Sequence, residues 1–170
     1  PNTVFSIGSV GRATAWSMSR NGLNSYEMEG TALKHYTLSE AWNLNTRTLT
    51  SFFSIDIGYG VAVEWNPDGT KCFIAGENGL KQYNAPTPYS LSGITQAYNL
   101  PRSNVAGFRW SADGKYFYVA SSDNGDIQQY ATSTDWSLSG APLNDTFSTG
   151  SPECKTMFLD STETKLYVLT

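Results

Sequence analysis

Three tyrosines, Tyr36, Tyr83 and Tyr130, lie 47 residues apart, and the same two kinds of side chain follow each of them. An aromatic residue stands six positions after each tyrosine, and a leucine stands two positions further on. The pairs are Trp42 and Leu44, Tyr89 and Leu91, and Trp136 and Leu138. Because this spacing holds without gaps in three copies, it indicates a structural repeat of about 47 residues.

The sequence upstream of each tyrosine predicts a β-hairpin. In the second unit, residues 61–65 alternate with the two-residue period of a strand, Pro67-Asp68-Gly69 has the composition of a tight turn, and an extended apolar run follows. Similar turns occur at Arg20-Asn21-Gly22 and Ala112-Asp113-Gly114, and a fourth hairpin without glycine begins at Leu159. The strands expected in the second unit are at about 61–65, 71–75, 79–84 and 94–99.

The repeat and the composition together predict an all-β chain. Helix formers are scarce, whereas β-branched and aromatic residues accompany 15 glycines and 7 prolines. Four antiparallel strands per unit, at a period in the forties, are typical of a β-propeller blade, since one such sheet must pack against neighbouring copies to bury both faces. We therefore expect a β-propeller of four-stranded antiparallel blades that forms part of a larger ring. A small four-bladed ring with one defective blade is the alternative.

The repeat divides residues 1–170 into segments of one propeller domain. Residues 3–7 match residues 51–55, so the chain is expected to open with the outer strand of a preceding blade. The expected segments are 1–8 for that strand, 12–57, 58–100 and 104–149 for three blades, and 154–170 for the start of a further blade.

Charge and cysteine content exclude several functional classes. The 11 basic and 15 acidic residues give a net charge of -4, and no basic cluster could neutralise a run of phosphates, so no nucleic-acid partner is expected. No apolar run is long enough to span a bilayer, so no membrane insertion is expected. Cys72 and Cys154 lie too far apart for metal-ligand spacing and are expected to be small buried side chains. We predict neither a metal nor a cofactor.

The repeat resembles blade repeats found in structural proteins of tailed bacteriophages and in related bacterial propeller proteins. The residues that carry the resemblance are Asp68 to Phe73, Gln82-Tyr83 and Tyr89 to Ser92, and again Asp113 to Phe117, Gln129-Tyr130 and Trp136 to Ser139. The first unit departs from the pattern, with Arg20-Asn21-Gly22 in its turn and His35-Tyr36 in place of Gln-Tyr. The resemblance implies a virion-associated tail or fibre protein and brings no catalytic residues with it.

The recurring aromatic residues Trp42, Tyr89 and Trp136 are the candidate ligand-binding residues. A ring of aromatic side chains on one rim could stack on sugars, although packing between adjacent sheets would also require them. Glu27 and Glu29 alternate on one strand and should share a face, as the paired carboxylates of glycosidases do. The equivalent positions in the second unit are apolar or glycine, which indicates either a solvent-facing strand or a local specialisation.

Two further motifs have simpler structural explanations. His35 is the single histidine, occupies the position of a glutamine in the other units, and has no nucleophile motif beside it. Asp123-Asn124-Gly125-Asp126 offers several oxygen ligands but lacks the spacing of an EF-hand, so we expect a hairpin turn.

The sequence predicts a non-enzymatic structural or adhesion module, and the resemblance implies that it belongs to a phage virion. Its expected partners are other virion subunits or a glycan or protein of the host surface. A lectin-like propeller, secreted or on a cell surface, is one alternative. A fragment of a glycan-active enzyme, with Glu27 and Glu29 at its site, is the other.

Overall fold

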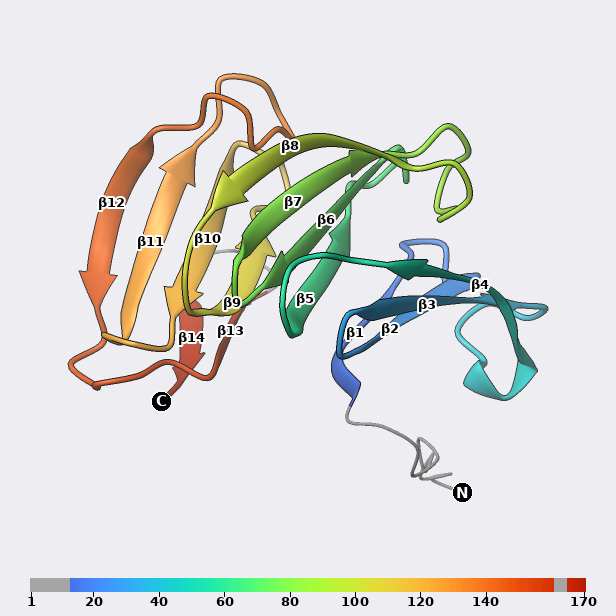
Figure 1. The fold of residues 1–170 in the computed structure, drawn as a ribbon, viewed down its shortest axis with the longest axis horizontal. Coiled ribbons are helices and arrows are strands. Elements are labelled where there is room, and N and C mark those ends of the chain that lie inside the picture. Colours follow the sequence, from blue (N-terminus) through green and yellow to red (C-terminus); the bar gives the residue numbers. More distant parts are fainter. Residues whose placement is uncertain (1–12, 161–164) are drawn as a thin grey trace.

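The computed structural model describes residues 13–160 and 165–170, and most of these residues form β-sheets. Three four-stranded antiparallel sheets follow one another along the chain, and a two-stranded sheet comes after them (Figure 1). Within each sheet the strands pair in chain order. We call these sheets blades 1 to 4. The prediction of an all-β fold with four-stranded antiparallel blades is confirmed.

The strands of each blade have the following bounds. Blade 1 contains β1 (Ala13–Met18), β2 (Asn24–Glu29), β3 (Ala32–Leu38) and β4 (Arg47–Ser54), with the short 3-10 helix η1 (Leu44–Thr46) before β4. Blade 2 contains β5 (Gly60–Trp65), β6 (Lys71–Gly76), β7 (Gly79–Asn84) and β8 (Thr95–Pro101). Blade 3 contains β9 (Val105–Trp110), β10 (Tyr116–Ser121), β11 (Asp126–Ala131) and β12 (Leu143–Ser148). Blade 4 contains β13 (Thr156–Leu159) and β14 (Leu166–Leu169).

The four strands expected in the second unit coincide with β5 to β8 to within two residues at each end. The strands of blades 1, 3 and 4 lie within 12–57, 104–149 and 154–170, and blade 2 runs one residue past the expected segment 58–100, to Pro101. The outer strand expected at 1–8 lies outside the described residues. The turn of the fourth hairpin, at 161–164, also lies outside them.

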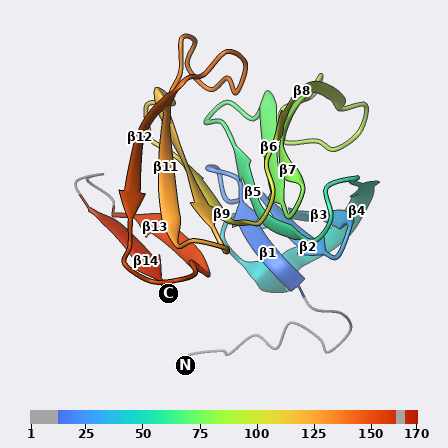
Figure 2. The same cartoon turned by 60° about the vertical axis from the view of Figure 1, so that its left-hand side comes forward.

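The blades stand side by side, with the first strand of each at the centre of the molecule. Each of the inner strands β1, β5 and β9 contacts the inner strand of the next blade there, whereas β4 and β12 lie at the two sides (Figure 1). Figure 2 shows the same arrangement from another side. We call the side of a blade that meets the following blade its forward face, and the opposite side its rear face.

The hydrophobic core consists of one cluster between each pair of adjacent blades. Between blades 1 and 2, Tyr26 and Met28 pack against Cys72 and Ile74, and all four are at most 1% exposed. The cluster between blades 2 and 3 includes Phe73, Phe108, Phe117 and Leu138. The cluster between blades 3 and 4 includes Ala120, Ile127, Cys154 and Met157. Full burial of one large apolar side chain contributes about 1.5–3 kcal/mol, so each sheet depends on its neighbour for stability.

A β-bulge recurs at the tyrosines that revealed the repeat. The pairing of the third strand with the fourth shifts register between His35 and Tyr36, and the same shift precedes Tyr83 and Tyr130. Because a bulge bends a strand and increases its twist, it turns the outer strand of each complete blade relative to the inner ones. The bulge and the tyrosine thus recur together in each complete blade.

Candidate functional site

The turns between the first and second strands of blades 1 to 3 share one hydrogen-bonded structure. The N–H groups of Gly22, Gly69 and Gly114 donate to the carbonyl oxygens of Ser19, Asn66 and Ser111, at 2.9, 3.0 and 3.0 Å respectively. An Asn or Asp side chain in each turn accepts from the backbone two residues later, as in Thr70 N to Asp68 Oδ1 at 2.9 Å. These bonds make each turn rigid, and they explain the Asx-Gly pattern of the sequence.

Each of the three candidate aromatic residues is fixed to the turn glycine of its own blade. The backbone N–H groups of Trp42, Tyr89 and Trp136 donate to the carbonyl oxygens of Gly22, Gly69 and Gly114, each at 2.9 Å. The rings also lie against these glycines, since an added Cβ atom would come within 2.6 Å of the ring in every case. We call this arrangement the glycine–aromatic clasp. It joins the loop after the third strand to the turn after the first.

The clasp holds the aromatic residues in an uncommon backbone conformation. Trp42, Tyr89 and Trp136 have φ values of 65°, 62° and 57°. Left-handed backbone is unfavourable for a bulky side chain and is retained only where the surroundings impose it. The three residues differ in exposure, because Trp42 is 62% exposed, Tyr89 is 9% exposed and Trp136 is half-buried.

The clasps also receive hydrogen bonds from the preceding blade. The Tyr26 hydroxyl of blade 1 donates to the carbonyl oxygen of Tyr89, and Lys71 Nζ of blade 2 donates to that of Trp136 at 3.0 Å. In addition, the N–H of Leu138 donates to Gln82 Oε1 at 2.9 Å. Burial raises the pKa of Tyr26, so its phenol remains a hydrogen-bond donor at neutral pH. The aromatic loops are therefore joined to two blades at once.

An ion pair between a half-buried glutamate and an exposed arginine joins the inner strands of blades 2 and 3. Glu64 Oε1 accepts from Arg109 Nη1 at 2.7 Å, and Glu64 Oε2 accepts from the backbone N–H of Trp110 at 3.1 Å. Burial raises the pKa of Glu64, and the Arg109 guanidinium and the Trp110 N–H oppose that rise. Arg109 Nε also donates to the carbonyl oxygen of Met157 in blade 4, at 3.4 Å. One arginine thus connects three consecutive blades.

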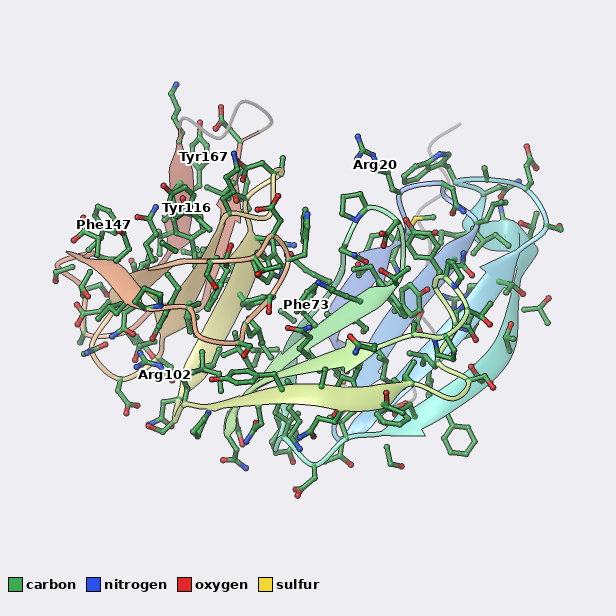
Figure 3. All side chains as sticks on the ribbon, turned by 90° about the horizontal axis from the view of Figure 1, so that it is seen from above. Arg20, Phe73, Arg102, Tyr116, Phe147 and Tyr167 are labelled. Carbon is green, nitrogen blue, oxygen red and sulfur yellow. The ribbon has the colours of Figure 1, made fainter. Side chains whose placement is uncertain are left out.

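A cleft lies on the side of the molecule where the turns and the clasps gather. It has two parts, of about 440 and 290 Å³, and Trp65, Ala112 and Trp136 line both of them. The larger part also contains Glu64, Arg109, Trp110 and Phe158, and the smaller contains Arg20 and Tyr89. We call the two parts together the rim cleft. Figure 3 shows Arg20, which lines the smaller part, projecting at the edge of blade 1.

The rim cleft contains two of the three predicted ligand-binding residues. Tyr89 and Trp136 line it, whereas Trp42 belongs to blade 1 and lines neither part. The sequence did not identify Trp65, Trp110 or Arg109 as candidates. Trp65 and Trp110 stand at the same position of the repeat, directly before their turns, and this recurrence was the available signal. A separate cavity of about 180 Å³ lies between the inner strands of all four blades.

Glu27 and Glu29 are engaged in two separate ion pairs. Glu27 contacts Arg47 and is 8% exposed, whereas Glu29 contacts Lys34. Both carboxylates are thus neutralised by a cation on the same face of blade 1. A glycosidase pair instead needs one carboxyl group that is kept protonated and one that is free to act as base or nucleophile.

His35 is buried between blades 1 and 2. Its ring stacks on Tyr26 at 5.0 Å, Nε2 lies 2.8 Å from Asn24 Oδ1, and Nδ1 lies 3.4 Å from Ser51 Oγ. Burial lowers the pKa of His35. Its surroundings therefore contain hydrogen-bond partners and a stacked ring, which is the environment of a structural histidine.

The loop at Asp123 to Asp126 forms a turn whose side chains bond to one another. Asn104 Nδ2 donates to Asp123, and Asn124 Nδ2 donates to Asp126 Oδ2 at 2.8 Å. Among residues 13–160 and 165–170, no group of three or more His, Cys, Asp or Glu residues is arranged to hold a metal ion. In the same described residues, no helical segment has the length and hydrophobicity that crossing a bilayer requires.

Comparison with known proteins relates the chain to β-propellers through its fold. No protein-family profile and no curated protein matches the sequence. Among solved structures, the β-propeller domain of Cps50 (Swd1) from Myceliophteria thermophila matches with a TM-score of 0.62 and 12% identity, over 85% of this chain and 46% of that one. A structure of the mitotic checkpoint complex matches with a TM-score of 0.71 and 12% identity, over 93% of this chain and 46% of that one.

A third solved structure, the hydrazine synthase of Kuenenia stuttgartiensis, has a TM-score of 0.68 and 14% identity, over 99% of this chain and 44% of that one. At these identities the similarity establishes the fold alone. The chain is therefore a β-propeller chain, and it spans less than half the length of these three solved structures.

Proposed function

We propose that this chain is part of a non-enzymatic β-propeller that binds a protein partner through the rim cleft. The observation that carries the proposal is the cleft itself, where the aromatic side chains of Trp65, Trp110 and Trp136 from two blades meet a charged pair. Aromatic residues and arginine are the side chains most often found at the energetic centres of protein interfaces. The clasp at Gly114 holds Trp136 in place before a partner arrives, which reduces the entropy lost on binding.

The proposal of a binding protein rather than an enzyme is supported by the state of the two glutamates. Glu27 and Glu29 are each paired with a cation, so neither has the environment of a general acid. The alternative of a glycan-active enzyme fragment depended on these two residues. Incubation with bacterial polysaccharides is the direct measurement, and release of reducing ends that Glu27→Gln abolishes would contradict the proposal.

A lectin with one sugar site per blade receives no support from the geometry. Such a lectin would present Trp42, Tyr89 and Trp136 equally, yet Tyr89 is buried and each ring lies against its own glycine. A partner that contacts one continuous cleft between blades agrees better with the unequal exposure of these rings. Peptide segments of a protein fill such a cleft through a few anchoring side chains.

The location of the protein remains a proposal from the resemblance of its repeat. Similarity to structural proteins of tailed phages supports a place in a virion, where the partner would be another subunit or a host surface protein. None of the three solved structures described above is named as a phage protein. Immunogold labelling of purified particles with an antibody against this chain would distinguish a virion from a secreted or cell-surface setting.

The binding proposal is tested by blocking the rim cleft. Ala112 lies in an exposed turn and lines both parts of the cleft, so Ala112→Trp would fill it without touching the core. The matched control is Ala97→Trp, at an exposed position of β8 that does not line the cleft. Peptides selected from a random display library on the unmodified protein should lose binding to Ala112→Trp and keep it with Ala97→Trp. Equal binding to both variants would refute the cleft as the site.

A further inference from the structure

One position of the repeat brings three different side chains to the smaller part of the rim cleft. The residues two positions before the turn glycines of blades 1 to 3 are Arg20, Pro67 and Ala112, and all three line this part. Two of them are uncharged. The departure of the first unit from the repeat pattern therefore places one cation in a wall whose other described residues carry no charge.

The rest of this wall is mostly aromatic or apolar, and the polar groups of its asparagine and its tyrosine are in use. Asn66 Nδ2 donates to Thr70 Oγ1 at 3.2 Å, and Asn66 Oδ1 accepts from the backbone N–H of Lys71 at 2.8 Å. The Tyr89 hydroxyl donates to the carbonyl oxygen of Pro67. The other lining residues are Met18, Trp65, Ala112 and Trp136. The volume of about 290 Å³ is near the lower end of ligand pockets, about 300–1,000 Å³, so there is room for an anchoring side chain.

Arg20 has no ionic partner in the part of the chain that the structure describes. None of the ion pairs found there includes Arg20. Asp68, in the neighbouring turn, does not line the cleft, and its Oδ1 accepts from the N–H and the hydroxyl of Thr70 at 2.9 and 2.6 Å. In the larger part of the cleft, by contrast, Arg109 is paired with Glu64. The smaller part thus offers a guanidinium that can pair with a group of the partner.

A guanidinium beside an apolar cleft favours a ligand that carries a carboxylate next to an apolar group. Arginine binds a carboxylate through two parallel hydrogen bonds, which are stronger than hydrogen bonds between neutral groups. The attraction between opposite charges also grows when a bound segment displaces water from the cleft, because the effective dielectric constant falls.

We propose that the partner segment carries an Asp or Glu beside a bulky apolar residue, with the apolar side chain in the smaller part of the rim cleft and the carboxylate on Arg20. This inference rests on the proposed function, because it specifies which protein segments the cleft accepts. Pro67 and Ala112 stand at the equivalent positions of the next two blades and cannot pair with a carboxylate. The chain therefore has one such acidic-segment site in blades 1 to 3 and not one per blade.

The proposal is tested with peptides selected on the unmodified protein from a random display library. Those that lose binding to Ala112→Trp depend on the cleft, and an Asp or Glu should recur beside their apolar anchor. They are then synthesised with amidated C-termini, so that side chains supply their only carboxylates. Arg20→Gln should weaken their binding about tenfold or more, since a hydrogen-bonded pair of charged groups is lost.

The matched control is Arg102→Gln, which removes the same charge from the loop between β8 and β9. Arg102 lines neither part of the cleft, and Figure 3 shows it well separated from Arg20. This variant should leave peptide binding unchanged. Both variants should unfold at the same urea concentration as the unmodified protein, because neither arginine takes part in an ion pair within the described residues. Equal losses of binding for the two variants would assign the effect to net charge and overturn the proposal.

A change of carboxylate to amide in the peptide shows whether the two charges touch. Replacing the recurring Asp by Asn, or Glu by Gln, should weaken binding to the unmodified protein about tenfold and hardly alter binding to Arg20→Gln, because the effects of contacting groups are not additive. The same loss on both proteins would overturn the proposal. Cleft-dependent peptides without a recurring acidic residue would overturn it too, while the binding function of the cleft would stand. If no selected peptide depends on the cleft, the proposed function itself fails, and this inference fails with it.

Discussion

At the scale of single residues, the recurring glycine and the recurring aromatic residue act as one unit. The aromatic residue follows the glycine by 20 positions in blades 1 and 2 and by 22 in blade 3, where the turn before β11 is longer. The sequence identified both members through their spacing. It did not reveal that they touch, because contact between residues so far apart depends on the path of the intervening hairpin. No sequence pattern predicts that a tryptophan will adopt a positive φ.

The clasp predicts an unequal response of two glycines to the same substitution. Gly69 has a φ of 73°, and an added Cβ would lie 2.6 Å from Tyr89 Cδ2. Gly140 has a φ of 68° with nothing within 4 Å. Gly140→Ala should cost only backbone strain, about 1–2 kcal/mol. Gly69→Ala should cost that amount and a further 1–3 kcal/mol or so for overlap with the ring. Urea denaturation measures both, and equal losses would show that the clasp adds nothing.

His35 predicts a defined dependence of stability on pH. Burial lowers its pKa from the ordinary value of 6.5, so the folded protein binds fewer protons at this site than the unfolded chain. Its contribution to stability is complete above pH 6.5 and is lost as the pH falls through the lowered pKa, by at most about 1.4 kcal/mol per pH unit. His35→Gln installs the residue found in the equivalent positions and removes the single histidine.

The measurement is the free energy of unfolding in urea between pH 7.5 and about 5.5, where carboxylates contribute little change. The unmodified protein should lose stability on acidification, and His35→Gln should show a nearly flat profile. If the two profiles fall in parallel, protonation of His35 is not the cause.

At the scale of strands and blades, the sequence was most informative about the strands and turns within each repeat. The four strands of blade 2 were predicted nearly to the residue because turn chemistry and alternation are local signals. Packing between blades was predicted, but the particular residue pairs that meet there were not. Glu64 and Arg109 occupy the same repeat position in consecutive blades, and a repeat alignment alone does not show that their opposite charges meet.

The Glu64–Arg109 pair predicts a large effect for one glutamate. Glu64→Leu should leave the partly buried N–H of Trp110 and the exposed guanidinium of Arg109 without their acceptor, which should cost about 1–2 kcal/mol of unfolding free energy. The matched control is Lys115→Ala, which removes an exposed pair with Asp113 at 3.7 Å and should change stability by less than about 0.5 kcal/mol. The double variant Glu64→Leu with Arg109→Leu should recover little of the loss, because the exposed guanidinium of Arg109 is hydrated without Glu64. A loss for Glu64→Leu no larger than that of the control would contradict the assigned role.

At the scale of the whole molecule, the blades differ in how much of each is covered. Blade 2 packs on a large hydrophobic cluster at both faces, whereas blade 4 shares only a small cluster with blade 3. The sequence predicted repeating units. It did not predict that neighbouring blades bury the faces of these units to different extents, because that depends on the order of the blades in space. The candidate site also depends on the order of the blades in space, because residues of several blades line the rim cleft.

The difference in hydrophobic packing between blades predicts a difference in the rate of amide hydrogen exchange. Local opening costs least where few apolar contacts are lost, so the amides of β13 and β14 should exchange at least tenfold faster than those of β6 and β7 (roughly 1.4 kcal/mol or more in opening free energy). Hydrogen exchange of the unmodified chain, detected by mass spectrometry, is the measurement. Uniform exchange of all four blades in the isolated chain would instead mean that the sheets open as one cooperative unit, and that the small cluster beside blade 4 is as stabilising as the larger ones.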